Sequence, residues 1–274
     1  MRAVPLAKGR NGMDLGDKVA IITGAAHGIG YACAARFAQE GARVMIADID
    51  ETAGAEAASV IQEAGGNAQF VACDVSDRLD VHNLVAATLE AHERVDVLIN
   101  NAAVVHSSDF LDLSEDDFER VMKVNLTGAF ITGQAVARVM KKQNEEDQRH
   151  GAIINMSSVN AEVAIPDQVP YVVAKGAINQ LTRVMAVSLA QHDIRVNAIG
   201  PGSISTGMLR SVNADDAGRA RLMSRTPMGR VGSPDEIAGV AVFLASDDAS
   251  YITGECIYAD GGRLALNLTV EGQS

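Results

Sequence analysis

Short apolar runs rich in valine and isoleucine alternate along the chain with longer, alanine-rich stretches. The short runs have the length of buried strands and the longer ones that of helices, so the pattern indicates repeated βαβ units. Strands of a parallel sheet are apolar throughout because helices cover both faces. We therefore predict an α/β fold with a doubly wound, seven-stranded parallel sheet and strands at residues 18–22, 43–47, 69–73, 95–99, 152–156, 194–199 and 255–259.

The segments between these strands predict the helices and the domain organisation. Residues 31–41 and 51–66 end in glycine, which suits a helix C-cap, and the charged run 141–151 is typical of a solvated helix end and turn. No linker-like composition divides the chain, so we predict one catalytic domain over 13–274. We interpret residues 1–12 as a disordered extension and residues 203–234, which mix Met, Leu, Arg and Asp, as a lid over a site.

Composition narrows the class of protein. Hydrophobic residues make up 47% of the 274 and aromatic residues only 4%, so the core must consist mainly of aliphatic side chains. The net charge of −12 argues against a nucleic-acid partner, which would require clustered Lys and Arg. No apolar stretch reaches the length of a membrane helix. The three cysteines lack the spacing of a zinc site or disulfide framework, so we expect buried thiols, no metal and a cytoplasmic location.

A glycine-rich turn follows the first predicted strand. The sequence TGAAHGIG (23–30) places Gly24, Gly28 and Gly30 between a strand and a helix, where small residues let the backbone approach a pyrophosphate. Asp48 follows the second strand at the distance expected of a carboxylate that binds the adenosine ribose and repels a 2′-phosphate. The pattern favours NAD over NADP. Asp48 could instead cap the next helix, although Asp50 is better placed to do so.

Tyr171 and Lys175 are four residues apart in a segment that predicts one long helix, so their side chains share a face. A neighbouring ammonium favours the phenolate and makes a tyrosine a better proton acceptor. Ser158 follows the strand at 152–156, at the edge of the sheet where α/β proteins bind ligands. Taken singly, these residues could equally be a half-buried tyrosine, a surface cation and a turn former.

Together these motifs resemble the short-chain dehydrogenase/reductase family. The resemblance extends from TGAAHGIG through CDV (73–75), NNAA (100–103), VNLTG (124–128), MSSV, YVVAK and IGPGSIST (199–206). NNAA replaces the family's usual NNAG, and His27 stands where Ser or Arg is common. The resemblance implies a Rossmann fold and NAD-dependent oxidoreduction, with the cofactor bound by Gly24, His27, Gly28, Ile29, Gly30, Asp48, Asp74, Val75, Asn101, Tyr171, Lys175, Ile204 and Thr206.

The family pattern also assigns roles within this set. It implies that Asp74 and Val75 contact adenine, that Asn101 lies beside the adenosine ribose, and that Ile204 and Thr206 hold the nicotinamide carboxamide. The implied catalytic residues are Tyr171 as acid/base, Lys175 and Ser158 as its partners, and Asn125 as the residue that positions a water beside the lysine. The serine spacing selects Ser158 over Ser157.

Assembly is likewise implied by the resemblance. Members of the family commonly form tetramers through two long helices. Here these would be one beginning near Val124 and the one carrying Tyr171. An apolar face of the second helix, formed by Ile178, Leu181, Val184, Met185 and Leu189, would serve a monomer's core equally well. The apolar C-terminal segment 264–270 could close a neighbour's pocket.

The substrate is expected to be a small hydroxylated molecule such as a sugar, polyol or other secondary alcohol. Polar residues around the predicted site motivate this hypothesis, although they could simply satisfy loop backbone groups. Reduction of a 3-oxoacyl thioester and an inactive nucleotide-sensing protein are the alternatives. The candidate pocket residues are Val104, Val105, His106, Ser107, Asn160, Glu162, Gln168, Met208 and Leu209.

Overall fold

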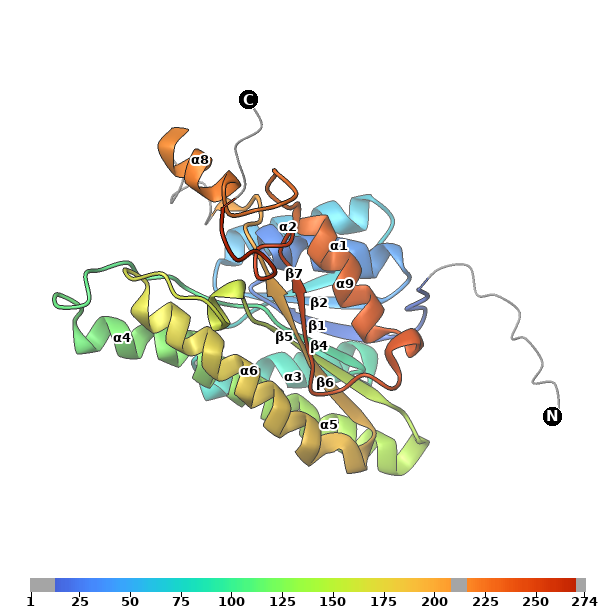
Figure 1. The fold of residues 1–274 in the computed structure, drawn as a ribbon. Helices are drawn as coiled ribbons and strands as arrows, with labels where there is room; N and C mark the ends of the chain where they lie inside the picture. The colour runs from blue at the N-terminus through green and yellow to red at the C-terminus, as the bar shows by residue number, and fades with distance from the viewer. Residues whose placement is uncertain (1–12, 208–215, 270–274) are drawn as a thin grey trace, which may run out of the picture.

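The computed structural model describes residues 13–207 and 216–269 of the chain. Seven strands form one parallel sheet in the order β3-β2-β1-β4-β5-β6-β7, which confirms the predicted doubly wound, Rossmann-like architecture (Figure 1). The predicted strands are all present, with their ends shifted by one or two residues. Their bounds are β1 (Val19–Thr23), β2 (Arg43–Asp48), β3 (Asn67–Ala72), β4 (Val97–Asn100), β5 (Gly151–Met156), β6 (Ile194–Pro201) and β7 (Cys256–Ala259).

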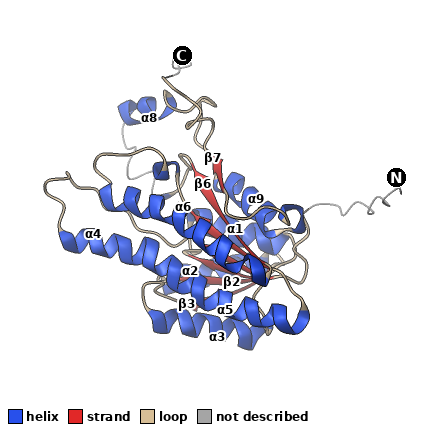
Figure 2. Cartoon of the chain, turned by 60° about the horizontal axis from the view of Figure 1, so that its bottom comes forward, coloured by secondary structure: helices blue, strands red, loops and turns tan. Residues whose placement is uncertain are grey.

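Helices cover both faces of the sheet because successive strand side chains point to opposite sides (Figure 2). Ala20 and Ile22 pack under one group of helices, whereas Ile21 between them packs under the other. The first group is α1 (Gly28–Gln39), α2 (Glu51–Glu63) and α9 (Pro234–Ala245), and the second is α3 (Arg78–His92), α5 (Ala129–Asp147) and α6 (Val169–Leu189).

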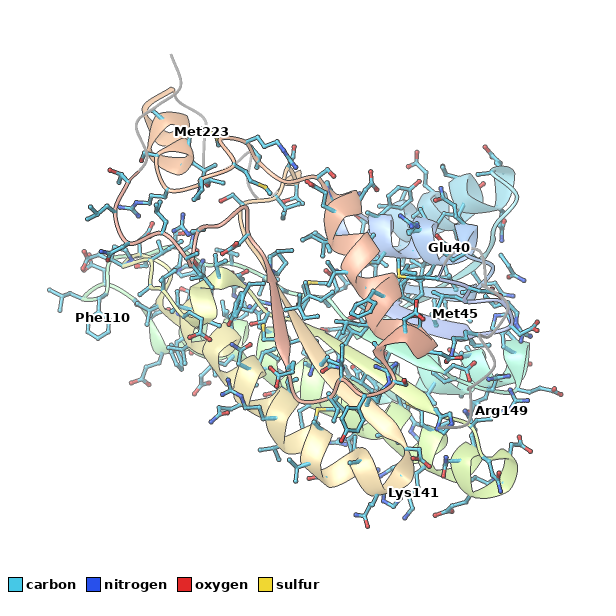
Figure 3. All side chains as sticks on the ribbon, turned by 45° about the vertical axis from the view of Figure 1, so that its right-hand side comes forward. Glu40, Met45, Phe110, Lys141, Arg149 and Met223 are labelled. Carbon is cyan, nitrogen blue, oxygen red and sulfur yellow. The ribbon has the colours of Figure 1, made fainter. Side chains whose placement is uncertain are left out.

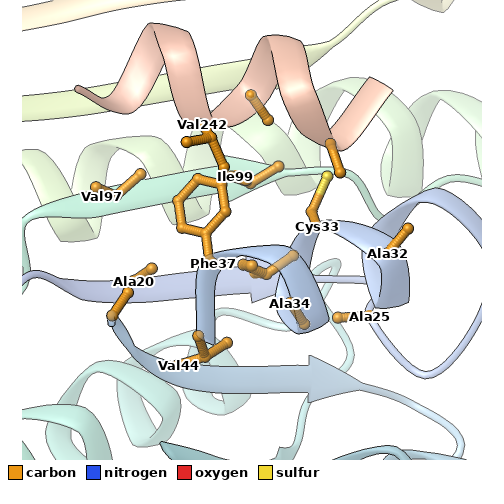
Figure 4. Close-up of a cluster of buried hydrophobic side chains, with 14 of the residues drawn as sticks. Ala20, Ala25, Ala32, Cys33, Ala34, Phe37, Val44, Val97, Ile99 and Val242 are labelled. Atoms are coloured by element: carbon orange, nitrogen blue, oxygen red, sulfur yellow. The ribbon is translucent and has the colours of Figure 1, made fainter. Parts of the chain in front are cut away.

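The core beneath α1 and α9 is built from small and aliphatic side chains around a single aromatic ring. Figure 4 shows Phe37 of α1 among Val44, Ile99 and Val242, and all four are fully buried. Cys33 lies in the same cluster, and burial raises the pKa of its thiol to about 12. Cys73 is buried as well, while Cys256 is only partly so. The thiols are free, as the sequence predicted.

The long helix that was predicted to begin near Val124 differs from that prediction at its start. It begins with α4 (Glu115–Met122) rather than near Val124, and passes through one π-helical turn, η1 (Lys123–Gly128), into α5. Ser114 caps α4 by accepting from the N–H of Asp117, and a serine before an acidic first turn is the signal in the sequence that marks this start. α4 and η1 pack against α6. π-turns within helices often mark functional positions, and this one carries Asn125.

The remaining elements are helix caps and short helices outside the sheet. Asp50, as predicted, caps α2 by accepting from the N–H of Ala53. α8 (Asp216–Met223) lies beyond the ends of β6 and β7, and Figure 3 labels its last residue. Three short helical turns, η2 (Val159–Ala161), η3 (Ala190–His192) and η4 (Asp247–Ala249), complete the described elements. None of the described helices is long and apolar enough to cross a membrane.

Candidate active site

A cavity of about 860 Å³ opens at the carboxyl ends of β4, β5 and β6. The strand order reverses direction between β1 and β4, and open α/β sheets bind ligands beside such a point. The cavity lining joins residues predicted for two different tasks. Predicted acid/base residues Ser158, Tyr171 and Lys175 line it together with predicted cofactor residues Ile29, Asn101, Ile204 and Thr206.

Ser158, Tyr171 and Lys175 come together although they belong to two segments. Ser158 follows β5 and caps η2, where its Oγ accepts from the N–H of Asn160 at 3.0 Å. Its hydroxyl is also hydrogen-bonded to the Tyr171 side chain. Lys175 lies one turn after Tyr171 on α6, with Nζ 5.5 Å from the centre of the tyrosine ring. The predicted one-face arrangement of this pair is confirmed.

Burial sets the protonation of these groups. Burial raises the pKa of Tyr171, and the hydrogen bond with Ser158 acts in the opposite direction. The pKa of Tyr171 is raised overall, whereas the neighbouring ammonium was expected to lower it. Lys175 is 3% exposed, and burial lowers its pKa to about 8. Its Nζ donates to the carbonyl oxygen of Met156 at 2.6 Å, which fixes the amine beneath the tyrosine.

The buried lysine is expected to cost stability. Below about pH 8 the amine is protonated in both the folded and the unfolded protein, so the full cost of burying its charge applies. Between this value and the ordinary lysine pKa the cost fades, because the folded state releases its proton first. We expect Lys175→Met to raise the free energy of unfolding at pH 7 by about 2 kcal/mol, after allowance for the lost hydrogen bond.

Urea denaturation of the wild type and Lys175→Met at pH 7 and pH 10 measures this difference. The increase in the free energy of unfolding caused by Lys175→Met should be smaller at pH 10 than at pH 7. Lys141→Met on the exposed end of α5 is the matched control and should show no such dependence. A gain that is equal at the two pH values would contradict the assigned pKa.

The glycine-rich turn leaves no room for side chains. Gly24 and Gly28 have φ values of +62° and +59°, a region that favours glycine. A Cβ on Gly24 would lie 2.7 Å from Cα of Ala102, and one on Gly30 would overlap the carbonyl oxygen of Gly24. His27 stands at the N-cap of α1 without a side-chain hydrogen bond there, so the first turn can present its N–H groups to an anion. The cradle fits a dinucleotide pyrophosphate.

Asn101 and Asp48 hold this turn from two sides. Asn101 Nδ2 donates to the carbonyl oxygens of Thr23 and Gly24 at 3.0 and 2.8 Å. Asp48 Oδ2 accepts from the N–H of Ala26 at 2.9 Å, and its Oδ1 accepts from that of Asp50 at 3.1 Å. Asp48 therefore does not cap α2, and its carboxylate stands beside the cofactor turn at the end of β2.

The remaining predicted cofactor residues lie on the same edge of the sheet. Asp74 and Val75 follow β3, where Asp74 Oδ1 accepts from the N–H of Ser76 and Val75 is buried. Ile204 and Thr206 follow β6, and Thr206 lies next to Gly28, whose added Cβ would be 3.3 Å from the threonine methyl. The segments after β1, β2, β3 and β6 thus all lie at the carboxyl edge of the sheet.

Asn125 has a structural task in addition to any catalytic one. Its Oδ1 accepts from the N–H of Val104 at 2.8 Å, and its Nδ2 donates to the carbonyl oxygen of the same residue at 2.9 Å. The side chain is buried and fastens the segment after β4 to the π-turn. It is not among the residues that line the cavity within the described part of the chain.

The predicted substrate residues divide into two groups. Val105, Asn160 and Gln168 line the cavity. Glu162 does not, because η2 turns it toward β7, where Oε1 accepts from the Tyr258 hydroxyl at 2.7 Å and from Asn179 at 3.2 Å. That prediction was wrong.

The other predicted substrate residues are not part of the described lining. Val104 is held by Asn125 through its backbone, His106 lies 3.5 Å from an Asp117 oxygen, and Ser107 is exposed. Met208 and Leu209 lie outside the described residues.

Sequence reasoning missed several residues of the lining. Ile165 and Pro166, between η2 and α6, supply apolar surface, whereas Arg225 and Arg263 supply charge. Nothing in their local sequence marks either arginine as part of a site. Arg263 follows the two glycines of an ADGG turn. Only the fold brings this turn beside the segments that follow β5 and β6.

Comparison with known proteins places the whole described region among oxidoreductases. A family model described as enoyl-(acyl carrier protein) reductase matches residues 24–263. L-Rhamnose 1-dehydrogenase (NAD(P)(+)) from Azotobacter vinelandii is 42% identical over 256 residues, which cover 92% of this chain and 98% of the relative.

Two solved structures are similar over nearly the full length. A short-chain type dehydrogenase/reductase from Mycobacterium marinum has 36% identity and a TM-score of 0.86, covering 93% of this chain and 98% of its own. A candidate 2-deoxy-D-gluconate 3-dehydrogenase from Agrobacterium tumefaciens, with bound NADP, has 34% identity and a TM-score of 0.86, covering 94% and 100%. Sequence identities of 34% and 36% over nearly the full length are well above the level at which two proteins share only a fold.

Proposed function

From the premise that this chain belongs to the short-chain dehydrogenase/reductase family, we propose that it is an NAD-dependent dehydrogenase that oxidises a secondary hydroxyl group of a sugar or polyol. As an NAD(P)-dependent oxidoreductase it acts on a CH–OH group of a small molecule. The observation that carries the proposal is the single cavity in which Tyr171 and Ser158 face the residues of the dinucleotide cradle.

Tyr171 is the proton acceptor of the proposed reaction. Its phenolate removes the proton of the substrate hydroxyl, and the nicotinamide, when bound, supplies the acceptor for the hydride that leaves the same carbon. Ser158 is hydrogen-bonded to Tyr171 and orients the hydroxyl between them. In the reverse direction Tyr171 donates the proton to a carbonyl oxygen.

Lys175 and Asn125 support the tyrosine. The amine of Lys175, held by Met156, stabilises the phenolate when it forms and takes part in binding the cofactor ribose. Asn125 lies in the π-turn behind this pair, and we assign it the positioning of a water that connects Lys175 to solvent.

The preference for NAD rests on Asp48. Its two oxygens accept backbone hydrogen bonds at the end of β2, so the negative charge is fixed beside the position expected for the adenosine ribose. A 2′-phosphate there would be repelled. His27 carries no permanent charge that could bind such a phosphate.

The sugar or polyol substrate is supported by the polar part of the lining. Asn160 and Gln168 are buried, and their amide groups can bind several hydroxyl groups. The relative that acts on L-rhamnose agrees with this class. Reduction of a 3-oxoacyl thioester is the alternative, and the reductase named in the family description acts on a different thioester, an enoyl one. An inactive sensor is disfavoured by the assembled Ser158, Tyr171 and Lys175.

A spectrophotometric screen tests the proposed function. Purified protein is mixed with NAD, and with NADP in parallel, across aldoses, alditols, aldonates and simple secondary alcohols. Acetoacetyl thioester with NADH and NADPH is the reverse assay. We expect NADH formation with a polyhydroxylated substrate. Turnover confined to the thioester would favour the reductase alternative, and no turnover in any assay would favour the inactive sensor.

We also propose a homotetramer in the cytoplasm. Phe130 of α5 and Val173, Val184 and Val187 of α6 are exposed although they are large and apolar, as expected of an interface face. The sequence left open whether the face that contains Ile178 and Val184 serves a core or an interface, and Ile178 is buried whereas Val184 is exposed. Light scattering should give four copies of the chain, and Val184→Glu with Val187→Glu should give smaller species. A monomeric wild type would contradict the assembly.

A further inference from the structure

The cavity carries more positive charge than proton transfer requires. Arg225, which follows α8, and Arg263, which follows β7, line it together with Lys175. Among the described lining residues there is no Asp or Glu. The chain as a whole has a net charge of −12, so a cavity whose described charged residues are all cations does not follow from composition. Lys175 is committed to Tyr171 and Met156, which leaves two arginines without a task in the reaction.

The side chains of Arg225 and Arg263 line the same cavity, and neither forms an ion pair with any described residue. Burial lowers the pKa of Arg263, and the neighbouring charge of Arg225 adds to this effect. The Nε of Arg263 is buried and has no hydrogen-bond partner in the described part of the chain. Such a donor, next to a like charge, costs free energy that a bound anion would recover.

The nearest acid to Arg263 is already in use. Asp260 Oδ1 accepts from the N–H of Gly262 and its Oδ2 from that of Leu264, both at 2.8 Å. These bonds hold the turn from which Arg263 extends. The charge of Asp260 offsets part of the unfavourable surroundings of Arg263, but no ion pair joins the two side chains. The turn therefore fixes the backbone at Arg263, and the buried Nε remains available to donate a hydrogen bond to a ligand.

The position of the two arginines indicates that they bind an anionic group of the substrate rather than the phosphates of the cofactor. The pyrophosphate cradle follows β1, whereas Arg263 follows β7, four strands away across the sheet. Ser158 follows β5, between these two positions. An anion bound by the arginines therefore lies on the far side of the reacting hydroxyl from the cradle.

We propose that Arg225 and Arg263 bind the carboxylate of a hydroxy acid, an aldonate whose secondary hydroxyl group faces Tyr171. The proposal rests on the proposed function and names its substrate class. A guanidinium group matches a carboxylate with two parallel hydrogen bonds, which makes the pairing specific as well as strong. The carboxylate is unchanged in the reaction. The hydroxyl proton passes to Tyr171, the C–H electron pair leaves as hydride to NAD, and the products are the keto acid, NADH and a proton.

The test compares five- and six-carbon aldonates with the alditols of the same configuration. For the wild type, kcat/KM should be on the order of 100-fold higher for the best aldonate than for its alditol. Arg263→Gln and Arg225→Gln should each lower this value by on the order of 100-fold, mainly through KM. Turnover of the alditol should change by less than about threefold. Arg263→Lys, which keeps the charge but not the planar fork, should recover only part of the loss.

Two further measurements keep the roles apart. Arg230→Gln is the matched control, because Arg230 lies in the same C-terminal segment, binds Glu236 and does not line this cavity. NADH affinity from fluorescence should be unchanged in all variants. Calorimetry of aldonate binding to the enzyme–NADH complex gives a readout independent of turnover and should show loss of binding in Arg263→Gln and Arg225→Gln only.

Three results would overturn the inference. The first is equal turnover of aldonates and alditols that neither arginine variant alters. The second is a loss of NADH affinity in the variants as large as the loss of substrate affinity, which would assign the arginines to the cofactor. The third is the absence of arginine-dependent aldonate binding in calorimetry. If aldonates bind through the arginines but no hydroxyl substrate is oxidised with either cofactor, the proposed function fails and the anion site stands.

Discussion

Tyr171→Phe is expected to lower kcat for hydroxyl oxidation by about 10³-fold, since a positioned acid/base group contributes effects of this order. The ring remains, so packing and the surroundings of Lys175 change little. The hydroxyl that is hydrogen-bonded to Ser158 is lost, and no other described side chain of the cavity is both bonded to Ser158 and able to accept a proton. NADH affinity should fall far less than kcat, because most of the predicted cofactor residues lie on other segments and only the Tyr171 hydroxyl is lost.

The pH profile gives a second readout for the same variant. Because burial raises the pKa of Tyr171, the phenolate fraction of the wild type increases with pH, and oxidation should accelerate from neutral to alkaline pH. Tyr171→Phe should lose this rise. Tyr251→Phe, the same change at a fully exposed position, is the control and should behave as the wild type. Retention of turnover within about tenfold of wild type, with an unaltered profile, would reject Tyr171 as the acid/base.

The fold was predictable because its signals are local and repeated. Except for β3, each strand is a largely apolar run of four to eight residues with helix-length segments on either side, so the number of strands and their parallel arrangement followed from the pattern. The start of α4 was missed, since its first turns are exposed and acidic and carry only one buried residue, Val121. The π-turn at Asn125 has no signature in hydrophobic spacing.

The relation between two site residues was predictable where both lie on the same helix, because their spacing in the sequence then fixes their relative position. Tyr171 and Lys175 share a helix, so one turn of α6 fixes their relation. Ser158 was preferred over Ser157 through the family pattern, and Ser157 Oγ donates to Asn179 Oδ1 at 2.7 Å. Glu162 was misassigned because the direction of a three-residue turn decides which way it points. Arg225 and Arg263 meet only through tertiary structure, which no local pattern records.

Asp48→Asn is expected to change the ratio of kcat/KM for NAD over NADP by on the order of 100-fold toward NADP. The carboxylate and a 2′-phosphate a few ångström apart repel by several kcal/mol at an intermediate dielectric, and partial exposure reduces this to about 3 kcal/mol. Asparagine is isosteric, and its one side-chain oxygen can still accept from the N–H of Ala26, so the glycine-rich turn should keep its shape. Its amide nitrogen cannot accept from the N–H of Asp50, so the variant removes the charge and one backbone hydrogen bond outside that turn.

Asp50→Asn is the matched control for this change. It removes one negative charge two residues away, where the side chain caps α2 and has no contact with the glycine-rich turn in the described structure. Asparagine is an equally good N-cap, so stability and cofactor ratio should both remain near wild type. Initial rates with the two cofactors, measured for the three proteins on one substrate, decide the matter. If Asp48→Asn and Asp50→Asn shift the ratio equally, general surface charge rather than the fixed Asp48 carboxylate selects the cofactor, and if neither shifts it, the preference lies elsewhere in the site.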